Sequence, residues 1–279
     1  MMENLSELAL DKQEKPKISV LMSVHNGADT LARSIESIIN QTFTDWEMII
    51  CDDGSIDNSY ELLLSFQEAD RRIKIIKNDT NQGLAYSLNR TIEIAKSIIL
   101  ARQDSDDWSD ACRFEKQYRF IMGHPEYAIV GTCWYNIDSR GNKTEHTARE
   151  YIQVKNLVSD GGFLHPSWMM RKDLLSQVGF YTVNKYTLRS QDYHLVLKLY
   201  GAGFTIYNLQ EFLYYYTVDE GTFKRSKNWK RVKGLMWIRW DGYRRNKFPI
   251  WSYVYVLKPL AVNLIPYSII RKHYEKRYK

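Results

Sequence analysis

The sequence has few cysteines, no glycine-rich phosphate motif and no apolar N-terminal segment. Its three cysteines, Cys51, Cys112 and Cys133, are far apart and odd in number, which argues against a disulfide framework or a cysteine-ligated metal. No G-x-G-x-x-G follows the first apolar segment and there is no Walker lysine motif, which disfavours dinucleotide-binding Rossmann enzymes and P-loop NTPases. The polar start, MMENLSELALDKQEKPK, does not resemble a signal peptide. We therefore expect a cytoplasmic protein in a reducing compartment.

Charge is unevenly distributed along the 279 residues. Residues 222–279 contain 16 Lys and Arg against 2 Asp and Glu, a net charge of +14, so that residues 1–221 carry −8. An acidic body joined to a strongly basic end indicates that this end meets an anionic partner.

Apolar strand-like runs alternate with amphipathic helix-like stretches through the first 101 residues. Short runs rich in β-branched residues are typical of strands buried on both faces, and apolar residues at a spacing of three or four are typical of helices. This alternation predicts an α/β fold with a Rossmann-like, mostly parallel sheet flanked by helices. We expect strands at 17–25, 47–51, 72–78 and 97–101, helices at 30–40, 58–69 and 84–96, then a helix at 112–122, a strand at 127–137, a loop, strand and helix within 161–179, and a helix at 190–203.

Three polar clusters follow predicted strands: SVHNG after the first, DDGS after the second and DSDD after the fourth. In open sheets of this kind ligands bind beyond the carboxyl ends of the strands, so the clusters predict one acidic crevice. Asp104 and Asp106 lie two positions apart, on one side of an extended segment. Mg²⁺ and Mn²⁺ prefer carboxylate oxygens together with substrate phosphates, and a cation here would relieve the repulsion between the aspartates.

Five segments match a known family in order and spacing. They are PKISVLMSVHNGADTLARSIESIINQTFTDWEMIICDDGSIDNS, NQGLAYSLN, ARQDSDDWSDACRFEKQ, HPSWMMRK and SQDYHLVLKL. In these segments, over roughly residues 17–201, the chain resembles a family 2 glycosyltransferase of the GT-A fold, of the bacterial surface-polysaccharide type. Such enzymes transfer a sugar from a nucleotide diphosphate sugar. A D-x-D motif alone would be weak support, whereas the ordered set is specific.

The resemblance implies that four residues bind the nucleotide of the donor. Asp53 would contact a uracil-type base or the ribose, while Ser23, His25 and Asn26 would line the pocket around them. Asn81, Gly83 and Asn89 would shape the adjoining loop, with direct contact to the donor as an alternative. Asp52 is expected to hold the turn.

The resemblance also implies a metal site and a catalytic base. Asp104 would approach the ribose and the metal, and Asp106 would ligate a divalent cation, Mn²⁺ or Mg²⁺. Asp192 matches the base that deprotonates the acceptor hydroxyl in a single inverting displacement; a helix N-terminal role without chemistry is its alternative. The chain departs from the family at Gln191, where many members have Glu, and at Ala111, where proline is usual.

Three further residues permit two interpretations. Asp107 and Asp110 are either part of the acidic site or residues at the start of the following helix, which its macrodipole favours. His165, before a proline, is either a metal or phosphate ligand or a packed loop residue.

Residues 223–279 are dense in Trp, Tyr, Lys and Arg. The apolar stretch 248–270 is long enough to span a bilayer, but Lys258, Pro259, Asn263 and Pro266 interrupt it. We therefore expect helices that lie on an anionic membrane surface. The alternatives are packing on the catalytic domain and, less favoured because no nucleic-acid module is present, nucleic-acid binding.

These observations predict a leader at 1–16, a GT-A catalytic domain at 17–221 (nucleotide-sugar half 17–110, acceptor half 111–221) and a membrane-associating helical tail at 222–279. The expected function is inverting, metal-dependent transfer of a sugar from a UDP-linked donor to a lipid-linked or growing glycan acceptor in surface polysaccharide synthesis. The enzyme would sit at the inner face of the cell membrane. A non-catalytic GT-A module that binds a glycan or a partner is one rival. A nucleotidyltransferase is the other, although SVHNGADT lacks the Gly-rich signature with Arg and Lys that is expected after the first strand of such an enzyme.

Overall fold

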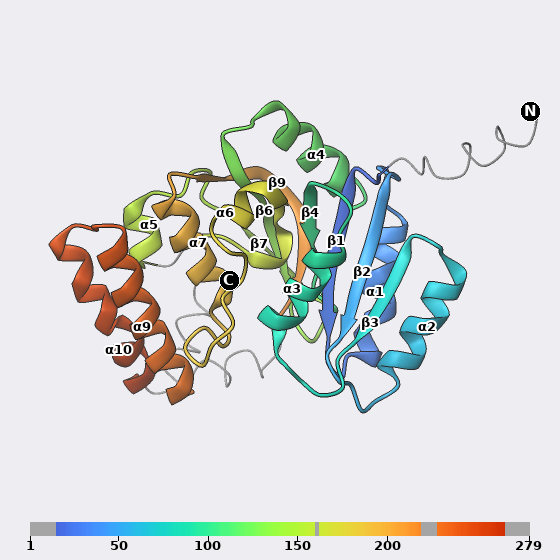
Figure 1. The fold of residues 1–279 in the computed structure, drawn as a ribbon, viewed down its shortest axis with the longest axis horizontal. Helices are drawn as coiled ribbons and strands as arrows, with labels where there is room; N and C mark the ends of the chain where they lie inside the picture. The colour runs from blue at the N-terminus through green and yellow to red at the C-terminus, as the bar shows by residue number, and fades with distance from the viewer. Residues whose placement is uncertain (1–14, 160–161, 219–227, 266–279) are drawn as a thin grey trace, which may run out of the picture.

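The first half of the chain forms a parallel sheet with helices between its strands (Figure 1). The structure, a computed structural model, describes residues 15–159, 162–218 and 228–265. The predicted alternation of strands and helices is confirmed, with boundaries that shift by a few residues. The elements are β1 (Ile18–Val24), α1 (Ala28–Ile39), β2 (Trp46–Asp52), α2 (Ser59–Ala69), β3 (Ile73–Lys77), α3 (Leu84–Ile94) and β4 (Ile99–Arg102).

Strand β1 shows why this half forms a sheet between two helical layers. Val20 and Met22 belong to the apolar cluster that contains α1, whereas Leu21 joins the cluster that contains α3. Successive side chains of a strand point to opposite faces, so each layer covers alternate residues. Each fully buried aliphatic side chain contributes roughly 1.5–3 kcal/mol relative to exposure. The continuous apolar run in the sequence is thus the consequence of burial on both faces.

Beyond β4 the sheet becomes mixed. Its order is β3-β2-β1-β4-β8-β6-β9-β5, with β7 beside β6. β8 runs antiparallel to both β4 and β6, while β6 and β9 are parallel to each other. The second half contains β5 (Trp108–Ser109), α4 (Arg113–Gly123), β6 (Tyr127–Ile137), β7 (Lys143–His146), α5 (Val154–Ser159), the 3₁₀ turn η1 (His165–Ser167), β8 (Met169–Arg171), α6 (Lys172–Gln177), α7 (Gln191–Gly201) and β9 (Thr205–Thr217).

Strand β9 was not identified from the sequence, nor were the short β7 and α5. β9 pairs with β6 along most of its length, with register shifts around Cys133. Bulges of this kind break the alternation by which a half-buried strand is identified. β9 matters for the site because its end, at Thr217, contacts the aspartate cluster.

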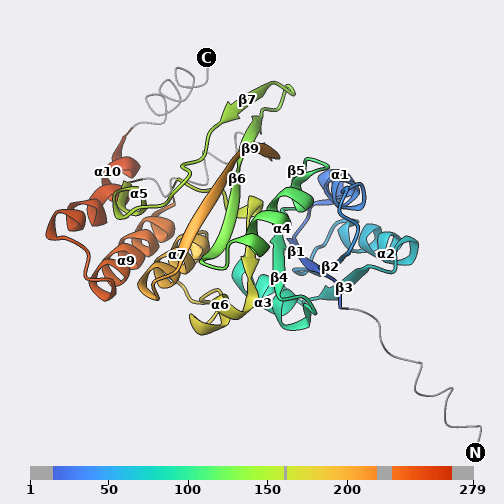
Figure 2. The same cartoon turned by 90° about the horizontal axis from the view of Figure 1, so that it is seen from above.

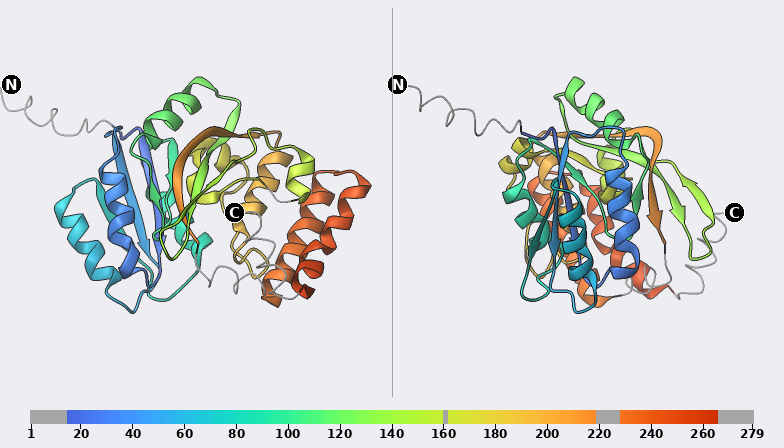
Figure 3. Two further views of the ribbon diagram at one scale, coloured as in Figure 1. Left: turned by 180° about the vertical axis from the view of Figure 1, so that it is seen from behind. Right: turned by 90° about the vertical axis from the view of Figure 1, so that its right-hand side faces the viewer.

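The basic tail is helical where it is described, and it packs on the body of the protein. It contains α9 (Trp229–Arg245), the 3₁₀ segment η2 (Ile250–Leu257) and α10 (Lys258–Leu264). Ile238, Tyr243 and Phe248 are part of the same apolar core as α3 and α7. Figures 2 and 3 show α1 and α2 at one end of the molecule and α9 and α10 at the other.

Hydrogen bonds also join the tail to the body. Arg239 donates to the carbonyl of Val158 at 2.7 Å, and the hydroxyls of Tyr193 and Tyr243 lie 3.1 Å apart. No helix in residues 15–159, 162–218 or 228–265 is both long and apolar enough to cross a membrane. The predicted leader, apart from residues 15 and 16, and the stretches 219–227 and 266–279 of the tail lie outside the described residues.

Candidate active site

Asp53, just after the end of β2, forms hydrogen bonds to the loop that follows β3. It is 2% exposed, and its carboxylate accepts hydrogen bonds from the backbone N–H groups of Gln82 (2.9 Å) and Gly83 (2.8 Å) and from the side chain of Asn78 (2.6 Å). Gly83 has φ 88°, a left-handed conformation that favours glycine. Asp53 therefore shapes the wall of the predicted nucleotide pocket.

The turn after β1 is held against the turn after β2. His25 Nδ1 lies 3.0 Å from the carbonyl oxygen of Asp53. Asn26 adopts φ 54°, and its side-chain oxygen accepts from the N–H of Ile56 at 2.9 Å. Asp52 is fully buried and accepts from the N–H of Ser55, which agrees with the structural role expected for it. Hydrogen bonds thus join the two turns, which follow the paired parallel strands β1 and β2.

Three aspartates gather after β4. Asp104, Asp106 and Asp107 each offer a carboxylate oxygen, and these oxygens all lie within 4.8 Å of one another. Asp107 is fully buried; its Oδ1 accepts from the N–H of Thr217 at 2.7 Å, and its Oδ2 is buried with no hydrogen-bond partner among the described residues. Burial, and then the charges of Asp106 and Asp104, raise the pKa of Asp107 well above its ordinary value.

This cluster fits a divalent cation. A buried carboxylate oxygen without a hydrogen-bond donor is costly, and three carboxylates in contact repel one another. A hard cation that takes oxygen ligands removes both penalties. Asp107, which the sequence analysis left between two roles, therefore belongs with Asp104 and Asp106. Its helix N-terminal alternative is wrong, because α4 begins only at Arg113. That interpretation is right for Asp110, which accepts from the N–H of Cys112 in the turn before α4.

The backbone of the cluster is held from several elements. Arg102, fully buried at the end of β4, is paired with the carboxylate of Asp104. From α1, Ser34 donates to the carbonyl of Asp104 at 2.7 Å. The hydroxyl of Thr217, at the end of β9, donates to the carbonyl of Asp106 at 2.6 Å. The position of the aspartates is therefore fixed by β9 as much as by β4.

Asp192 lies in the first turn of α7, half-buried. Burial raises the pKa of its carboxyl; the N–H of Tyr193 and the charge of Arg231 oppose this rise, and the charge of Asp104 adds to it. Asp104 and Asp192 are 88 positions apart in sequence, yet each lies within electrostatic range of the other. The charge of one predicted metal residue thus reaches the predicted base from the other half of the chain.

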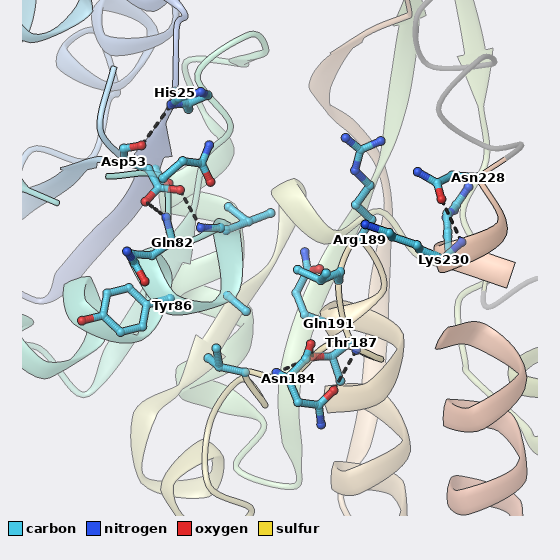
Figure 4. Close-up of a pocket in the computed structure, with 18 residues that line it drawn as sticks. His25, Asp53, Gln82, Tyr86, Asn184, Thr187, Arg189, Gln191, Asn228 and Lys230 are labelled. Atoms are coloured by element: carbon cyan, nitrogen blue, oxygen red, sulfur yellow. Dashed lines mark hydrogen bonds between the residues drawn. The ribbon is translucent and has the colours of Figure 1, made fainter. Parts of the chain in front are cut away.

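A cavity of about 530 Å³ opens between the turns after β1 and β2, the loop before α7 and the start of α9 (Figure 4). His25 and Asp53 lie on one side of it, and Arg189, Asn228 and Lys230 lie on the other, with open space between (Figure 4). Its lining is formed by Ser23, His25, Asp53, Asn81, Gln82, Gly83, Leu84, Ala85, Tyr86, Val183, Asn184, Thr187, Leu188, Arg189, Gln191, Asn228, Lys230 and Arg231.

The lining places the predicted residues in two groups. Ser23, His25 and Asp53 line the cavity, as does the loop at Asn81 and Gly83. Asn26 does not line it; its side chain holds a neighbouring turn instead. Asp104, Asp106 and Asp192 are also outside this lining, although the charges of Asp104 and Asp192 act on each other.

The sequence analysis missed Arg189, Lys230 and Arg231 as residues of this site. Lys230 and Arg231 were counted with the basic tail, and only the packing of α9 on α7 shows that the start of this helix faces the cavity. Arg189 carried one signal, its nearness to Gln191 and Asp192 in the chain.

His165 is a packed residue rather than a ligand. It is 7% exposed, and its Nε2 lies 2.7 Å from the hydroxyl of Tyr181. Burial, with the nearby charge of Arg102, holds the pKa of His165 well below its usual range, so the ring is neutral at pH 7. Asn89 is structural as well: its amide bonds the backbone of Tyr181 in both directions, at 2.8 and 3.1 Å.

A sheet flanked by helices, a cavity at the carboxyl ends of β1 and β2 and three aspartates after β4 are the features expected of a sugar-transferring enzyme of the GT-A fold. The chain belongs to glycosyl transferase family 2, whose model matches residues 19–179. It is 35% identical over 263 residues to the EpsE protein of Bacillus subtilis (strain 168), covering 94% of each chain. It is 31% identical over 221 residues to the O-antigen biosynthesis glycosyltransferase WbnJ of Escherichia coli, covering 75% of this chain and 82% of WbnJ.

Solved structures share the fold at lower identity. Residues 1–349 of S. aureus TarS in complex with UDP-GlcNAc align with a TM-score of 0.67 and 18% identity, over 89% of this chain and 71% of that one. The mannosyltransferase PcManGT of Pyrobaculum calidifontis, in complex with GDP-Man and Mn²⁺, aligns with a TM-score of 0.64 and 15% identity, over 95% and 81% of the two chains.

Proposed function

We propose that this glycosyltransferase is a metal-dependent, inverting enzyme that moves a sugar from a UDP-linked donor to a lipid-linked or growing glycan acceptor. Its product would be a surface polysaccharide. Two observations carry the proposal: the charge of Asp104 acts on Asp192, which comes from the opposite half of the chain, and Asp53 and His25 line one cavity together with Gln191, the neighbour of Asp192.

In this proposal the base and ribose of the donor lie against Ser23, His25 and Asp53. Asp106 and Asp104, with Asp107 beside them, would hold Mn²⁺ or Mg²⁺. When bound, the cation neutralises the charge that develops on the diphosphate leaving group. The hydrogen bonds between the turns after β1 and β2 preorganise the pocket, which favours affinity for the nucleotide.

Asp192 would accept the proton of the attacking acceptor hydroxyl. The hydroxyl oxygen bonds to the anomeric carbon as the bond from that carbon to the diphosphate oxygen breaks, with inversion at the carbon. A raised pKa brings a carboxylate closer to the operating pH, where a general base acts best. Burial of Asp192 gives this direction of shift.

The comparisons support a nucleotide diphosphate sugar as the donor more strongly than they support the choice of its base. TarS was solved with UDP-GlcNAc and PcManGT with GDP-Man, so a nucleotide diphosphate sugar has more support than uracil as the base. WbnJ is named for O-antigen biosynthesis, which supports a surface polysaccharide as the product.

We place the enzyme at the cytoplasmic face of the membrane, bound through its tail. Ile250, Val254 and Leu257 of η2 are 86%, 73% and 56% exposed, an apolar face next to the basic residues at the end of α9. Apolar residues beside Lys and Arg suit an anionic lipid surface.

The first experiment is incubation of the purified protein with Mn²⁺ and a panel of UDP- and GDP-sugars, without acceptor. Slow release of the free nucleotide from one donor, abolished by EDTA and by Asp106→Ala, is the expected result. Asp106 is exposed, so its truncation should leave the fold intact.

Other outcomes distinguish the rival functions. If donors bind, as measured by calorimetry, but none is turned over with or without glycan acceptors, the non-catalytic binding module is correct. Formation of a nucleotide sugar from a nucleoside triphosphate and a sugar phosphate would identify a nucleotidyltransferase.

A further inference from the structure

Three cations from two distant segments line the side of the cavity that faces the nucleotide wall. Arg189 comes from the loop before α7, and Lys230 and Arg231 come from the first turn of α9. Figure 4 shows Arg189 and Lys230 across the open space from His25 and Asp53. We refer to Arg189, Lys230 and Arg231 as the cationic wall.

The side chains of the cationic wall have no ion-pair partner within residues 15–159, 162–218 and 228–265, although the charge of Arg231 acts on the carboxyl of Asp192. None of its three side chains forms an ion pair or hydrogen bond there, and the Nε of Arg231 is buried without an acceptor. Further along the same helix, by contrast, Arg244 and Arg245 both pair with Asp241. A buried guanidinium N–H without a partner is unfavourable, and an anion in the cavity would supply what it lacks.

The backbone adds to this positive potential. α9 has 17 residues, and its N-terminus, capped by Asn228, lies at the cavity. The N-terminus of a helix favours anions, and guanidinium groups bind phosphate oxygens in bidentate geometry. A phosphate or diphosphate is therefore the ligand that this wall fits best.

The position of Arg231 indicates which substrate carries that phosphate. The charge of Arg231 acts on Asp192, the proposed base, which must lie at the acceptor hydroxyl. In the proposed function, the diphosphate of the donor would lie at the aspartate cluster, held through a divalent cation. An anion held by Arg231 therefore lies on the acceptor side of the reaction.

We propose that the cationic wall binds a phosphate or diphosphate group of the acceptor, the group that joins its sugar to a lipid carrier. This rests on the proposed function, because it takes Asp192 as the base. It makes α9 part of the acceptor site as well as part of the tail, and it predicts that acceptors with a phosphate linkage are preferred over neutral glycans.

Calorimetry with inorganic pyrophosphate as the probe tests the anion site directly. In EDTA, pyrophosphate should bind the wild-type protein and bind Arg231→Gln at least tenfold more weakly. Lys233→Gln is the matched control, because Lys233 is exposed on the same helix and does not line the cavity. Equal affinity in all three proteins would overturn the anion site.

A second titration decides between donor and acceptor. With Mn²⁺, UDP should bind Arg231→Gln as tightly as it binds the wild-type protein; a tenfold loss would assign the wall to the donor diphosphate and overturn the proposal. If the wild-type protein releases no nucleotide from any donor, the proposed function fails instead. The pyrophosphate titration would still show whether the wall binds anions.

Discussion

Asp192 is a carboxylate whose surroundings oppose its ionised form. Burial and the charge of Asp104 raise its pKa, and Arg231 offsets part of that rise. Groups with pKa values perturbed by both burial and a specific neighbour are concentrated at catalytic sites. At the residue scale, the cost of burying this charge is the feature that suits Asp192 to accept a proton.

Asp192→Asn should lower sugar transfer by about 10²–10⁴-fold, the usual contribution of a general base. Affinity for UDP with Mn²⁺ should be unchanged, because Asp192 is outside the nucleotide wall. Transfer is measured as nucleotide release and UDP affinity by calorimetry. Wild-type rates in this variant would exclude Asp192 as the base.

The same substitution should not destabilise the protein at neutral pH. The native state holds a proton on Asp192 up to a higher pH than the unfolded state does, so the free energy of unfolding falls as pH rises from the ordinary pKa through the raised one. Above that window the ionised group is unfavourable, and Asn removes this charge. Urea unfolding at pH 7 should give Asp192→Asn a free energy of unfolding equal to or above that of the wild-type protein. A marked decrease would mean that lost transfer reflects misfolding.

Asp107→Asn should stabilise the metal-free protein and weaken its response to metal. The amide oxygen keeps the acceptor for the N–H of Thr217, while a buried carboxyl whose ionised form is disfavoured by burial and by Asp106 and Asp104 is removed. A gain of about 1 kcal/mol corresponds to a rise in Tm of about 2–4 °C for a chain of this size. Thermal unfolding in EDTA and in Mn²⁺ measures both effects; a larger Mn²⁺-induced rise in the variant than in the wild-type protein would remove Asp107 from the metal site.

At the scale of elements, the close packing of α9 on α7 positions the proposed acceptor site. A Cβ at Gly234 would lie 2.3 Å from the carbonyl oxygen of Tyr186, and one at Gly242 would lie 2.6 Å from Leu197. These glycines let α9 approach α7 and the loop that carries Arg189. The cationic wall thus depends on a close backbone contact between the tail and the body.

Gly234→Ala should lower the free energy of unfolding by about 1–3 kcal/mol, as expected for overpacking against rigid backbone. Because the displaced loop carries Arg189, pyrophosphate binding should fall as well. Gly123→Ala is the control: Gly123 ends α4 with nothing within 4 Å of its added Cβ. Urea unfolding and calorimetry compare the two variants, and equal effects from both would contradict the role assigned to this contact.

Elements differ in how far the sequence predicts them. β1 and β2 are buried on both faces, so their apolar runs identify them directly, and α1 shows its apolar face at Leu31, Ile35 and Ile38. β9 has bulges in its pairing with β6, and its aromatic residues are buried or half-buried without regular alternation, so no period marks it. The hydrogen bonds of Thr217 to Asp106 and Asp107 could therefore not be predicted from the sequence.

At the scale of the whole molecule, the charge asymmetry acts at two places. Residues 1–221 carry −8 and the remainder +14. Part of that positive charge, at Lys230 and Arg231, faces the cavity, and the end of α9 lies near the exposed apolar face of η2. One helix thus connects the proposed membrane surface to the proposed acceptor site.

The protein should sediment with vesicles that contain anionic lipid, and binding should weaken with salt because charges attract it. Ile250→Asp with Val254→Asp should reduce the bound fraction about tenfold, since two exposed apolar contacts are lost. Ile98→Asp is the control, because Ile98 is 63% exposed near β4, away from η2. Unchanged binding by the double variant would remove η2 from the membrane surface.

The sequence by itself determined the α/β alternation of the first half, the polar edge after its strands and the identity of Asp53, Asp104, Asp106 and Asp192 as candidates. The alternation and the polar edge follow from local patterns, because strand burial and turn chemistry involve neighbours in the chain, whereas the roles of Asp53 and Asp192 were implied by the resemblance to family 2 glycosyltransferases. Only the tertiary structure decided that Asp107 joins the cluster, that His165 is packed and that Lys230 and Arg231 face the cavity. Each of these depends on contacts with a segment that is distant in the sequence. The contacts of β9 with the aspartates and of α9 with α7 produce no periodic pattern from which they could be predicted.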